Sequence, residues 1–511
     1  MWRFAPSLVL LAIAIADCGR YADTDLWGHL WFGKLLLQRG PHPGPDPYSY
    51  APHLPEWLHH EWLSEVLMAW IYAGAGVIGL KLWKLACSAA TILLIAAAQA
   101  ETGTPMAMQC IVLLAVSFGL IPYMQFRPLL FSYVFTAATI ALITRNNYHG
   151  KALPWIVIPG FALWSNLHGS FFVGLGVLGI YTAARGGADL VAGLGLRRGK
   201  KLALITLASA LATLVTPYGI NTWRAVAISL QNPMTRHVMA DWRPLLVVLA
   251  QARGEAHGGA LFLWFAIAIM LALAIGLIIA PRGDDFALVV VAAALDVGAF
   301  MAVRNAPLAL IASAAPLTRH LGLALHKGFP KKTPDGAAGE DSSAHALSWT
   351  TQAFVSILAA VMLISGGLFS RRLPAAMRYP DGAITFMDSH KLHGNILNYF
   401  AWGQYLIWHE SPGSKVFIDG RYDLVYPPEV VRQYLDLYTV RPDANVVLDH
   451  YPHDYVLLPA NSPAARWLDT RRDWQLIYRD ATAVLYARAG SSIARQSLTP
   501  ATGSGAPSYF P

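Results

Sequence analysis

Two aspartates near the amino terminus, Asp23 and Asp25, are the side chains of this chain best placed to do chemistry. They stand two positions apart in the stretch Tyr-Ala-Asp-Thr-Asp-Leu-Trp-Gly-His, directly after the first apolar segment. Two carboxylates this close can share a divalent cation with phosphate oxygens, or one can deprotonate an acceptor hydroxyl while the other orients it. The alternative is structural, because aspartates also cap helices and a helix is expected over 26–38.

A second polar stretch, with His60 and Glu61, lies further along the same loop. An imidazole next to a carboxylate suits proton transfer or contact with a phosphate. The alternative is that the neighbouring aromatic residues anchor this segment at a membrane surface, with solvated polar tips.

Three more ionisable residues, Arg127, His168 and Arg304, stand at the ends of apolar segments. An arginine there can bind a phosphate with two parallel hydrogen bonds, or extend to the lipid headgroups. When the spans are threaded, all three fall on the same side of the bilayer as Asp23 and Asp25. Their placement on one side of the bilayer favours a functional role for these residues, because ionisable groups at membrane depth usually face a polar cavity.

The composition predicts a polytopic membrane protein. Of the 511 residues, 55% are hydrophobic and only 13% are charged, against about 25% charged in soluble proteins. The net charge of +8 comes from basic residues in short loops between apolar segments. An orientation of these loops toward the cytoplasm explains the excess of basic residues. No basic stripe with stacking aromatics is present, so nucleic-acid binding is not expected.

About 11 transmembrane helices are expected, since a span needs about 17–25 mostly apolar residues. They are placed at 4–18, 77–99, 105–122, 129–145, 153–166, 170–185, 202–216, 259–281, 285–303, 305–319 and 349–370. The segment 58–76 is interpreted as an amphipathic helix on the outer surface, because its first turns are polar and glycines follow. Lys81 and Lys84 count against this threading, because they then lie near the outer end of a span.

The domain organisation follows from a change in composition near residue 371. Residues 1–370 form the membrane domain, with a first outer loop at 19–76 and a linker at 322–347. Residues 371–489 alternate β-rich runs with amphipathic helices, which predicts a small α/β domain with a largely parallel sheet. The Ser-, Gly- and Pro-rich tail 490–511 is expected to be disordered.

Candidate ligand contacts in the α/β domain are Trp402, Asp419, Arg421 and Asp423. They follow expected strands, and loops beyond the carboxyl ends of parallel strands are where such sheets bind ligands. The alternative is a tight turn that contains an internal Asp–Arg pair.

These motifs resemble bacterial integral-membrane glycosyltransferases of the GT-C type. The resemblance rests on Asp-Thr-Asp-Leu-Trp-Gly-His-Leu, His60-Glu61-Trp62, Trp402-Gly403-Gln404-Tyr405 and Phe417-Ile418-Asp419-Gly420-Arg421. It covers most of 20–130 and 380–425, with the intervening spans matched only in pattern. Oligosaccharyltransferases carry the signature Trp-Trp-Asp-Tyr-Gly. The corresponding stretch of this chain lacks the aspartate, so the resemblance does not imply recognition of a peptide acceptor.

The resemblance implies transfer of a sugar from a polyprenyl-phosphate or polyprenyl-pyrophosphate carrier to a glycan, lipid or protein acceptor outside the cytoplasm. It implies that the catalytic acidic residue of the first outer loop is Asp23 or Asp25. Some relatives bind Mg²⁺ or Mn²⁺ and others need no metal, so a metal at this pair stays open. The expected location is the bacterial inner membrane, with the α/β domain in the periplasm. The rival interpretations are a transporter or flippase for a lipid-linked glycan, and a non-catalytic scaffold.

Overall fold

The computed structural model describes residues 6–41, 44–195, 197–232, 239–252, 259–328, 349–491, 493–494 and 508–510. The chain divides into two compact units. Unit 1 consists of Met1–Arg20, Ile78–Gly219 and Met239–Ser370. Unit 2 consists of Tyr21–Val77, Ile220–Val238 and Arg371–Pro511. The loop after α1, at 21–77, therefore belongs to the same compact unit as the carboxyl-terminal residues.

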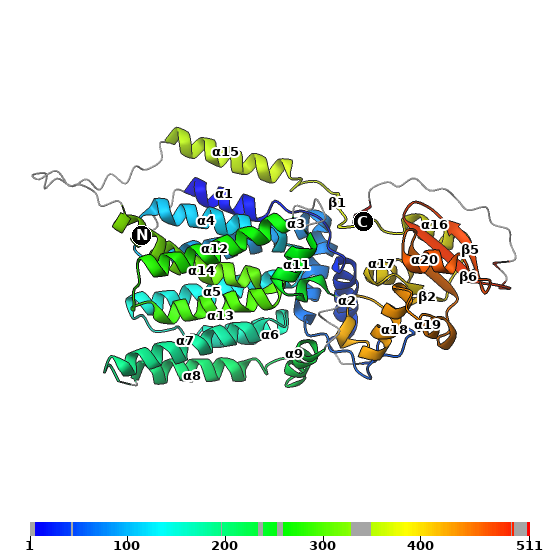
Figure 1. The fold of residues 1–511 in the computed structure, drawn as a ribbon, viewed down its shortest axis with the longest axis horizontal. Coiled ribbons are helices and arrows are strands. Elements are labelled where there is room, and N and C mark those ends of the chain that lie inside the picture. The colour runs from blue at the N-terminus through cyan, green and yellow to red at the C-terminus, as the bar shows by residue number, and fades with distance from the viewer. Residues whose placement is uncertain are drawn as a thin grey trace, which may run out of the picture. The chain divides into compact units, whose positions relative to one another are not determined.

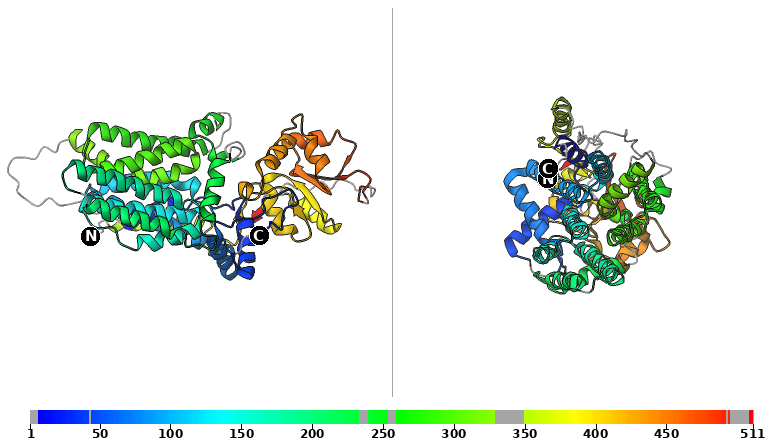
Figure 2. Two further views of the ribbon diagram at one scale, coloured as in Figure 1. Left: turned by 90° about the horizontal axis from the view of Figure 1, so that it is seen from below. Right: turned by 90° about the vertical axis from the view of Figure 1, so that its left-hand side faces the viewer.

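Unit 1 is a bundle of helices that run side by side (Figures 1 and 2). Its elements are α1 (Pro6–Ala16), the second part of α3 (Trp62–Ala100), α4 (Met106–Leu120), η1 (Ile121–Tyr123), α5 (Leu129–His149), α6 (Val157–Leu167), α7 (Phe171–Val191), α8 (Arg197–Ala212), η2 (Ala240–Trp242), α11 (Leu245–Ala252), α12 (Gly259–Ile279), α13 (Phe286–Met301), η3 (Val303–Asn305), α14 (Ala306–Gly328) and α15 (Trp349–Ser365). Each expected span coincides with one of these helices, although the edges differ by several residues.

Helix α14 lies at the centre of the bundle. It packs against α4, α5, α12 and α13, and its residues 306–318 are buried without a break. Five alanines in that stretch let neighbouring helices approach closely, which is how helices pack where there is no water to drive association.

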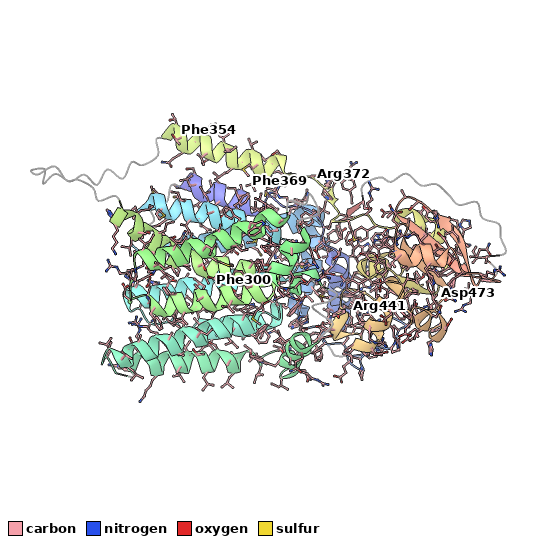
Figure 3. All side chains as sticks on the ribbon, viewed as in Figure 1. Phe300, Phe354, Phe369, Arg372, Arg441 and Asp473 are labelled. Atoms are coloured by element: carbon pink, nitrogen blue, oxygen red, sulfur yellow. The ribbon has the colours of Figure 1, made fainter. Side chains whose placement is uncertain are left out.

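Among the described residues, six helices are long and apolar enough to cross a membrane. They are Trp62–Ala100, Met106–Tyr123, Leu129–His149, Phe171–Val191, Ala260–Ile279 and Val303–Lys327, and four shorter apolar helices accompany them. Large apolar side chains stand on the outer faces of unit 1, such as Phe300 on α13 and Phe354 on α15 (Figure 3). The prediction of a polytopic α-helical membrane protein is confirmed.

A buried charge cluster explains the lysines that counted against the threading. The ammonium of Lys84 lies 2.9 Å from a carboxylate oxygen of Asp17 and 2.9 Å from its carbonyl oxygen. Arg20 donates to the other carboxylate oxygen of Asp17, at 2.6 Å. Lys81 donates to the carbonyl oxygens of Gly367 and Ser370, at 2.7 and 2.8 Å. Both lysines are therefore neutralised or solvated by the protein itself, as buried cations require.

Unit 2 joins α2 (Leu26–Arg39), the start of α3 and α9 (Asn221–Gln231) to the carboxyl-terminal domain. That domain comprises β1 (Leu373–Pro374), α16 (Asp381–Ser389), β2 (Asn395–Asn398), η4 (Phe400–Trp402), α17 (Gly403–Glu410), β3 (Lys415–Val416), η5 (Tyr422–Leu424), α18 (Pro428–Tyr438), α19 (Asn445–His450), β4 (Tyr455–Pro459), α20 (Pro463–Leu468), β5 (Trp474–Arg479), β6 (Ala483–Arg488) and β7 (Tyr509–Phe510). The expected small α/β domain is confirmed, with strands close to their predicted positions.

The main sheet is mixed, which corrects the prediction of a largely parallel one. Its strand order is β3-β2-β4-β6-β5. Strand β2 is parallel to β3 and β4, whereas β6 is antiparallel to β4 and β5. The physical reason is that β5 and β6 are joined by a short turn at residues 480–482, and a short turn can connect only antiparallel strands.

The end of the tail is ordered, contrary to the prediction for 490–511. Strand β7 pairs antiparallel with β1, and Phe510 packs against Trp27 with ring centroids 5.0 Å apart. A composition average over the tail misses two aromatic residues at its end. Residues 495–507 of that prediction lie outside the described part of the chain.

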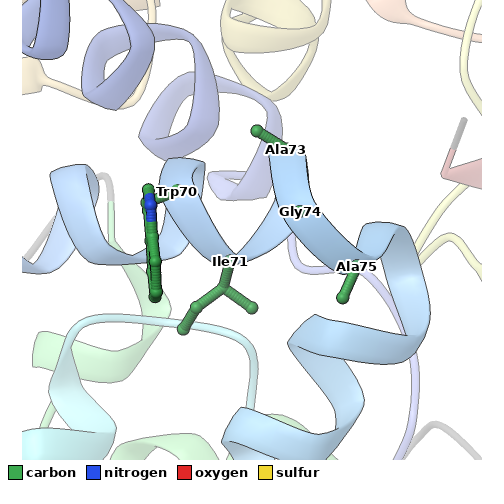
Figure 4. A pocket seen from close by; sticks show the side chains of 5 residues that line it. All are labelled: Trp70, Ile71, Ala73, Gly74 and Ala75. Carbon is green, nitrogen blue, oxygen red and sulfur yellow. The ribbon is translucent and has the colours of Figure 1, made fainter.

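Helix α3 breaks at Gly76, where φ is 58° and ψ is −149°. That backbone conformation is essentially restricted to glycine. Just before the break, Trp70, Ile71, Ala73, Gly74 and Ala75 line an open apolar hollow (Figure 4). The interpretation of 58–76 as an amphipathic helix on the outer surface stays a prediction.

The Lys84–Asp17 pair generates a stability prediction. Lys84→Met leaves the buried Asp17 carboxylate with less compensating charge, which costs about 3–5 kcal/mol for pairs of this kind. We expect a clearly lower thermal unfolding midpoint of the detergent-purified protein, and partial recovery in the double variant Lys84→Met/Asp17→Asn. Lys151→Met, at an exposed lysine of the same unit, is the control. A wild-type midpoint for Lys84→Met would contradict the assignment.

Candidate functional site

Asp23 and Asp25 form a turn at the amino terminus of α2. The backbone N–H of Asp25 donates to a carboxylate oxygen of Asp23 at 3.0 Å. Asp25 occupies the N-cap position, but its side chain makes no capping hydrogen bond. Asp23 is buried and Asp25 is half-buried. The helix-capping alternative therefore does not account for the Asp25 carboxylate, whereas Asp23 holds the backbone of Asp25.

Two residues of the carboxyl-terminal domain lie directly against Asp25. A Cβ atom added to Gly420 would stand 2.5 Å from a carboxylate oxygen of Asp25 and 2.8 Å from the amide nitrogen of Gln404. The same amide group of Gln404 lies against Gly28 on α2, where a Cβ atom would overlap with it. The absence of side chains at Gly28 and Gly420 thus lets Gln404 and the Asp-Gly-Arg loop approach the Asp-Thr-Asp turn.

Gln404 is buried, and its side-chain oxygen has no hydrogen-bond partner among the described residues. A buried amide oxygen without a partner is uncommon, because the loss of its hydration is unfavourable. The oxygen stands at Gly28, and the amide nitrogen of the same side chain stands at Gly420 together with Asp25, which makes Gln404 a candidate contact for a polar ligand there.

One helical turn below Asp25, His29 begins a cluster of imidazoles and carboxylates. Its Nδ1 lies 3.2 Å from Glu65, and His59 Nδ1 lies 3.3 Å from the other oxygen of Glu65. His60 Nε2 lies 3.6 Å from Glu61. Burial alone would lower the pKa of His29, but the hydrogen bond to Glu65 and the nearby carboxylates outweigh it and raise that pKa.

Arg421 is the centre of a buried charge cluster. It donates to Asp419 at 2.8 and 2.6 Å, and to Asp46 at 2.5 and 3.2 Å. Its guanidinium carbon lies 4.3 Å from the ring centroid of Trp57 and 5.1 Å from that of Phe32. Charge, paired hydrogen bonds and cation–π contacts thus act on one side chain.

This cluster connects the loop after α1 to the carboxyl-terminal domain at neutral pH. Burial would raise the pKa of the Asp46 carboxyl, but the charge and hydrogen bonds of Arg421 hold it below its ordinary value. A carboxyl with a lowered pKa stabilises the folded state above the ordinary pKa of about 4. Its contribution is lost only as the pH falls through the lowered value.

The structure gives Trp402, Asp419 and Arg421 internal partners. Trp402 is buried and its indole N–H donates to the carbonyl oxygen of Arg378 at 3.1 Å. Asp419 and Arg421 form the internal pair that the sequence left as an alternative to ligand binding. Asp423 is half-buried in η5. As direct substrate contacts these four residues stay predictions, and their observed contacts favour a positioning role for the first three.

Within unit 1, His168, Arg127 and Arg304 occupy helix junctions. His168 follows α6, and its Nδ1 accepts the backbone N–H of Ser170 at 2.9 Å and contacts the hydroxyl of Ser132 at 2.9 Å. The guanidinium carbon of Arg304 stands 4.3 Å from the ring centroid of Trp242. Arg127 stands in the turn before α5, where its backbone N–H donates to the carbonyl oxygen of Gln125 at 2.9 Å. Their role as phosphate ligands is untested.

Sequence reasoning missed Gln404, Gly420 and the carboxylate of Glu65 as parts of this site. Gln404 and Gly420 lie inside the Trp-Gly-Gln-Tyr and Asp-Gly-Arg stretches, so those motifs were a usable signal. Glu65 stands four residues after Glu61, a spacing that places both on one helix face. Nothing in the sequence indicates that His29 lies opposite them.

Comparison with known proteins identifies the fold. No protein-family model matches the chain, and no functionally curated protein matches its sequence significantly. The structure resembles the oligosaccharyltransferase AglB from Archaeoglobus fulgidus, solved with an inhibitory peptide and a dolichol-phosphate, at a TM-score of 0.52 and 14% identity over 89% of this chain and 69% of that one. For the apo form of the Archaeoglobus fulgidus oligosaccharyltransferase the TM-score is 0.54, with 12% identity over 96% and 75% of the two chains.

A variant of the arabinofuranosyltransferase AftD from Mycobacteria also matches, at a TM-score of 0.51 and 14% identity over 96% of this chain and 42% of that chain. At these identities the likeness concerns the fold. The chain has the GT-C fold of these membrane glycosyltransferases.

Arg421 generates a prediction on stability. Arg421→Met leaves Asp46 and Asp419 buried without their cation, and we expect a loss of about 3–5 kcal/mol in unfolding free energy. Arg421→Lys keeps the charge but loses the forked geometry, so its loss should be intermediate. Arg441→Met removes an exposed arginine (Figure 3) and should change stability by less than about 1 kcal/mol. Thermal unfolding of the detergent-purified variants ranks their losses of stability. Equal unfolding midpoints for Arg421→Met and Arg441→Met would contradict the expected ranking.

Proposed function

Because the chain has the GT-C fold, we propose that it is a membrane glycosyltransferase that moves a sugar from a polyprenyl-phosphate or polyprenyl-pyrophosphate carrier to an acceptor outside the cytoplasm. The AglB neighbour was solved with a dolichol-phosphate, which supports a lipid-linked donor. The acceptor is a glycan, a lipid or a protein. The peptide in the AglB structure does not narrow this choice, because the chain lacks the acid of the oligosaccharyltransferase signature.

The observation that carries the proposal is the placement of Asp25. Its side chain makes no capping bond, is half-buried, and lies against Gly420, where the amide nitrogen of Gln404 also stands. A carboxylate in such a position can accept the proton of an acceptor hydroxyl while neighbouring dipoles orient that hydroxyl. Asp23 keeps the Asp25 backbone in place through its hydrogen bond.

In the proposed reaction, Asp25 takes the proton of the acceptor hydroxyl as that oxygen bonds to the anomeric carbon. The bond between the anomeric carbon and the carrier phosphate breaks, and the electron pair leaves with the phosphate. Inversion at the anomeric carbon is part of the proposal. We assign stabilisation of the departing phosphate to His60, which belongs to the same compact unit as Asp25.

The Asp23 and Asp25 carboxylates are also the residues that would hold Mg²⁺ or Mn²⁺ in this proposal. Carboxylate oxygens are the ligands that such an ion prefers, and the hydrogen bond from the Asp25 N–H to Asp23 holds the two residues in one turn. The ion would supply positive charge to the carrier phosphate.

The proposed location is the bacterial inner membrane, with unit 2 on the outer side. It rests on the basic loops Arg145/Lys151, Arg197–Lys201 and Arg282, which the positive-inside rule places in the cytoplasm.

The catalytic assignment is tested by substitution of Asp25. Asp25→Asn removes the base without a change of size, so transfer of label from a lipid-linked sugar in membranes should fall by about 10²- to 10⁴-fold. Asp23→Asn should lose less, because an asparagine oxygen can still accept the Asp25 N–H. Asp473→Asn changes an exposed carboxylate of the same unit that pairs with Arg471 (Figure 3) and should transfer normally. Transfer by Asp25→Asn at the wild-type rate would contradict the assignment of Asp25 as the base.

The contact between Gly420 and Asp25 gives a second test. Gly420→Ala places a methyl group against the Asp25 carboxylate and Gln404, and one of them must move. We expect transfer to fall at least about tenfold with folding kept, since small displacements of a catalytic group are costly. Gly44→Ala is the matched control, because a Cβ atom there meets nothing within 4 Å. Full activity of Gly420→Ala would contradict the claim that transfer requires the observed position of the Asp25 carboxylate.

A further inference from the structure

The cluster below Asp25 comes from two crossing helices and the loop before the second one. His29 belongs to α2, Glu65 stands in the first turn of α3, and His59, His60 and Glu61 directly precede that helix. The helices approach closely because Gly33 has no side chain, and a Cβ atom there would overlap with the backbone carbonyl of Glu65. This close crossing is what brings His29 and Glu65 within 3.2 Å.

The charge of the cluster is not balanced by a fixed cation. Glu65 is buried, and its partners among the described residues are the imidazoles of His29 and His59. A buried carboxylate requires a compensating positive charge. Arg421 supplies it for Asp46 and Lys84 supplies it for Asp17, whereas Glu65 is paired with imidazoles, which compensate its charge only while they are protonated.

The geometry matches that of a metal site. Ligand atoms of His29, Glu61 and Glu65 all lie within 4.8 Å of one another. Bonds of about 2.0–2.2 Å from one ion to nitrogen and oxygen ligands separate those ligands by about 3–4 Å. Small side-chain rotations therefore suffice, and His59 stands beside Glu65 as a further ligand.

We propose that His29, Glu61 and Glu65 bind a divalent transition-metal ion of the Zn²⁺ type, at a site separate from the Asp23–Asp25 pair. Imidazole ligands favour Zn²⁺ and similar ions over Mg²⁺, which prefers oxygen ligands and keeps its water. The ion fastens α2 to the start of α3 one helical turn from Asp25. Its role is to position the helix that carries Asp25, and it needs no contact with substrate.

The test uses the full-length protein in detergent, stripped by a chelator and then dialysed. Zn²⁺ is added in the presence of excess Mg²⁺, and bound zinc is measured by mass spectrometry and by competition with a fluorescent chelator. We expect stoichiometric zinc that excess Mg²⁺ does not displace, and a higher thermal unfolding midpoint with zinc, because a ligand that binds only the folded state stabilises it. Stripped wild-type protein that takes up no zinc would overturn the proposal.

Variants locate the ion. His29→Gln, Glu61→Gln and Glu65→Gln should each weaken zinc binding by at least about tenfold. The double variant His149→Gln/Glu101→Gln removes a His–Glu pair of 2.8 Å in unit 1 and should bind zinc normally. Because Glu61 is half-buried, its variant keeps the test decisive if the other two fail to fold. Normal zinc binding by folded Glu61→Gln would overturn the site.

The proposal is independent of the transfer reaction. If Asp25→Asn abolishes transfer but keeps zinc, both proposals stand. If zinc is lost in Asp25→Asn and kept in folded His29→Gln and Glu65→Gln, the ion belongs to the Asp23–Asp25 pair. That result would overturn this inference and leave the proposed function intact. Co²⁺ in place of Zn²⁺ provides a check without activity, since its visible absorption bands should change in His29→Gln.

Discussion

The pairing of Arg421 with Asp46 and Asp419 is the interaction on which unit 2 depends. It is buried, it uses the forked geometry of the guanidinium in full, and it lies on the rings of Trp57 and Phe32. Asp46 belongs to the loop after α1, and the other two residues belong to the carboxyl-terminal domain. Because a buried charge without its partner is strongly unfavourable, this cluster holds the two segments in one register. Gly420, between Asp419 and Arg421, is thereby brought against Asp25.

Glycines make that arrangement possible. Gly28 admits Gln404, Gly33 admits the start of α3, and Gly420 admits the Asp25 carboxylate. At each position the reason is a close approach by another segment, and at none is it an unusual backbone angle. The result is an Asp-Thr-Asp turn that is closely surrounded, with Asp25 half-buried and Asp23 in a supporting role. Such surroundings orient a carboxylate and lower its contact with water, which strengthens its interactions.

Unit 1 also contains buried charges that compensate one another. Asp17, Lys84 and Arg20 compensate one another in the interior, and Lys81 is solvated by carbonyl oxygens after α15. Charges that would oppose membrane insertion one by one are acceptable as a bonded group. The same principle makes Glu65 noteworthy, because it is a buried carboxylate whose partners are imidazoles. A metal ion is the compensation that its ligand set is suited to.

The local pattern of the sequence determined the membrane helices, the strands near 395, 455, 474 and 483, and the Asp-Thr-Asp, Trp-Gly-Gln-Tyr and Asp-Gly-Arg stretches as places of interest. Apolar length and strand alternation are properties of neighbouring residues, so they can be read without a structure. Only the tertiary structure decided that the sheet is mixed, that Arg421 is paired internally, and that β7 closes the tail onto β1. It also decided that His29 meets Glu65. These are contacts between segments far apart in the chain, and their partners are chosen by packing and charge compensation, on which local periodicity carries no information.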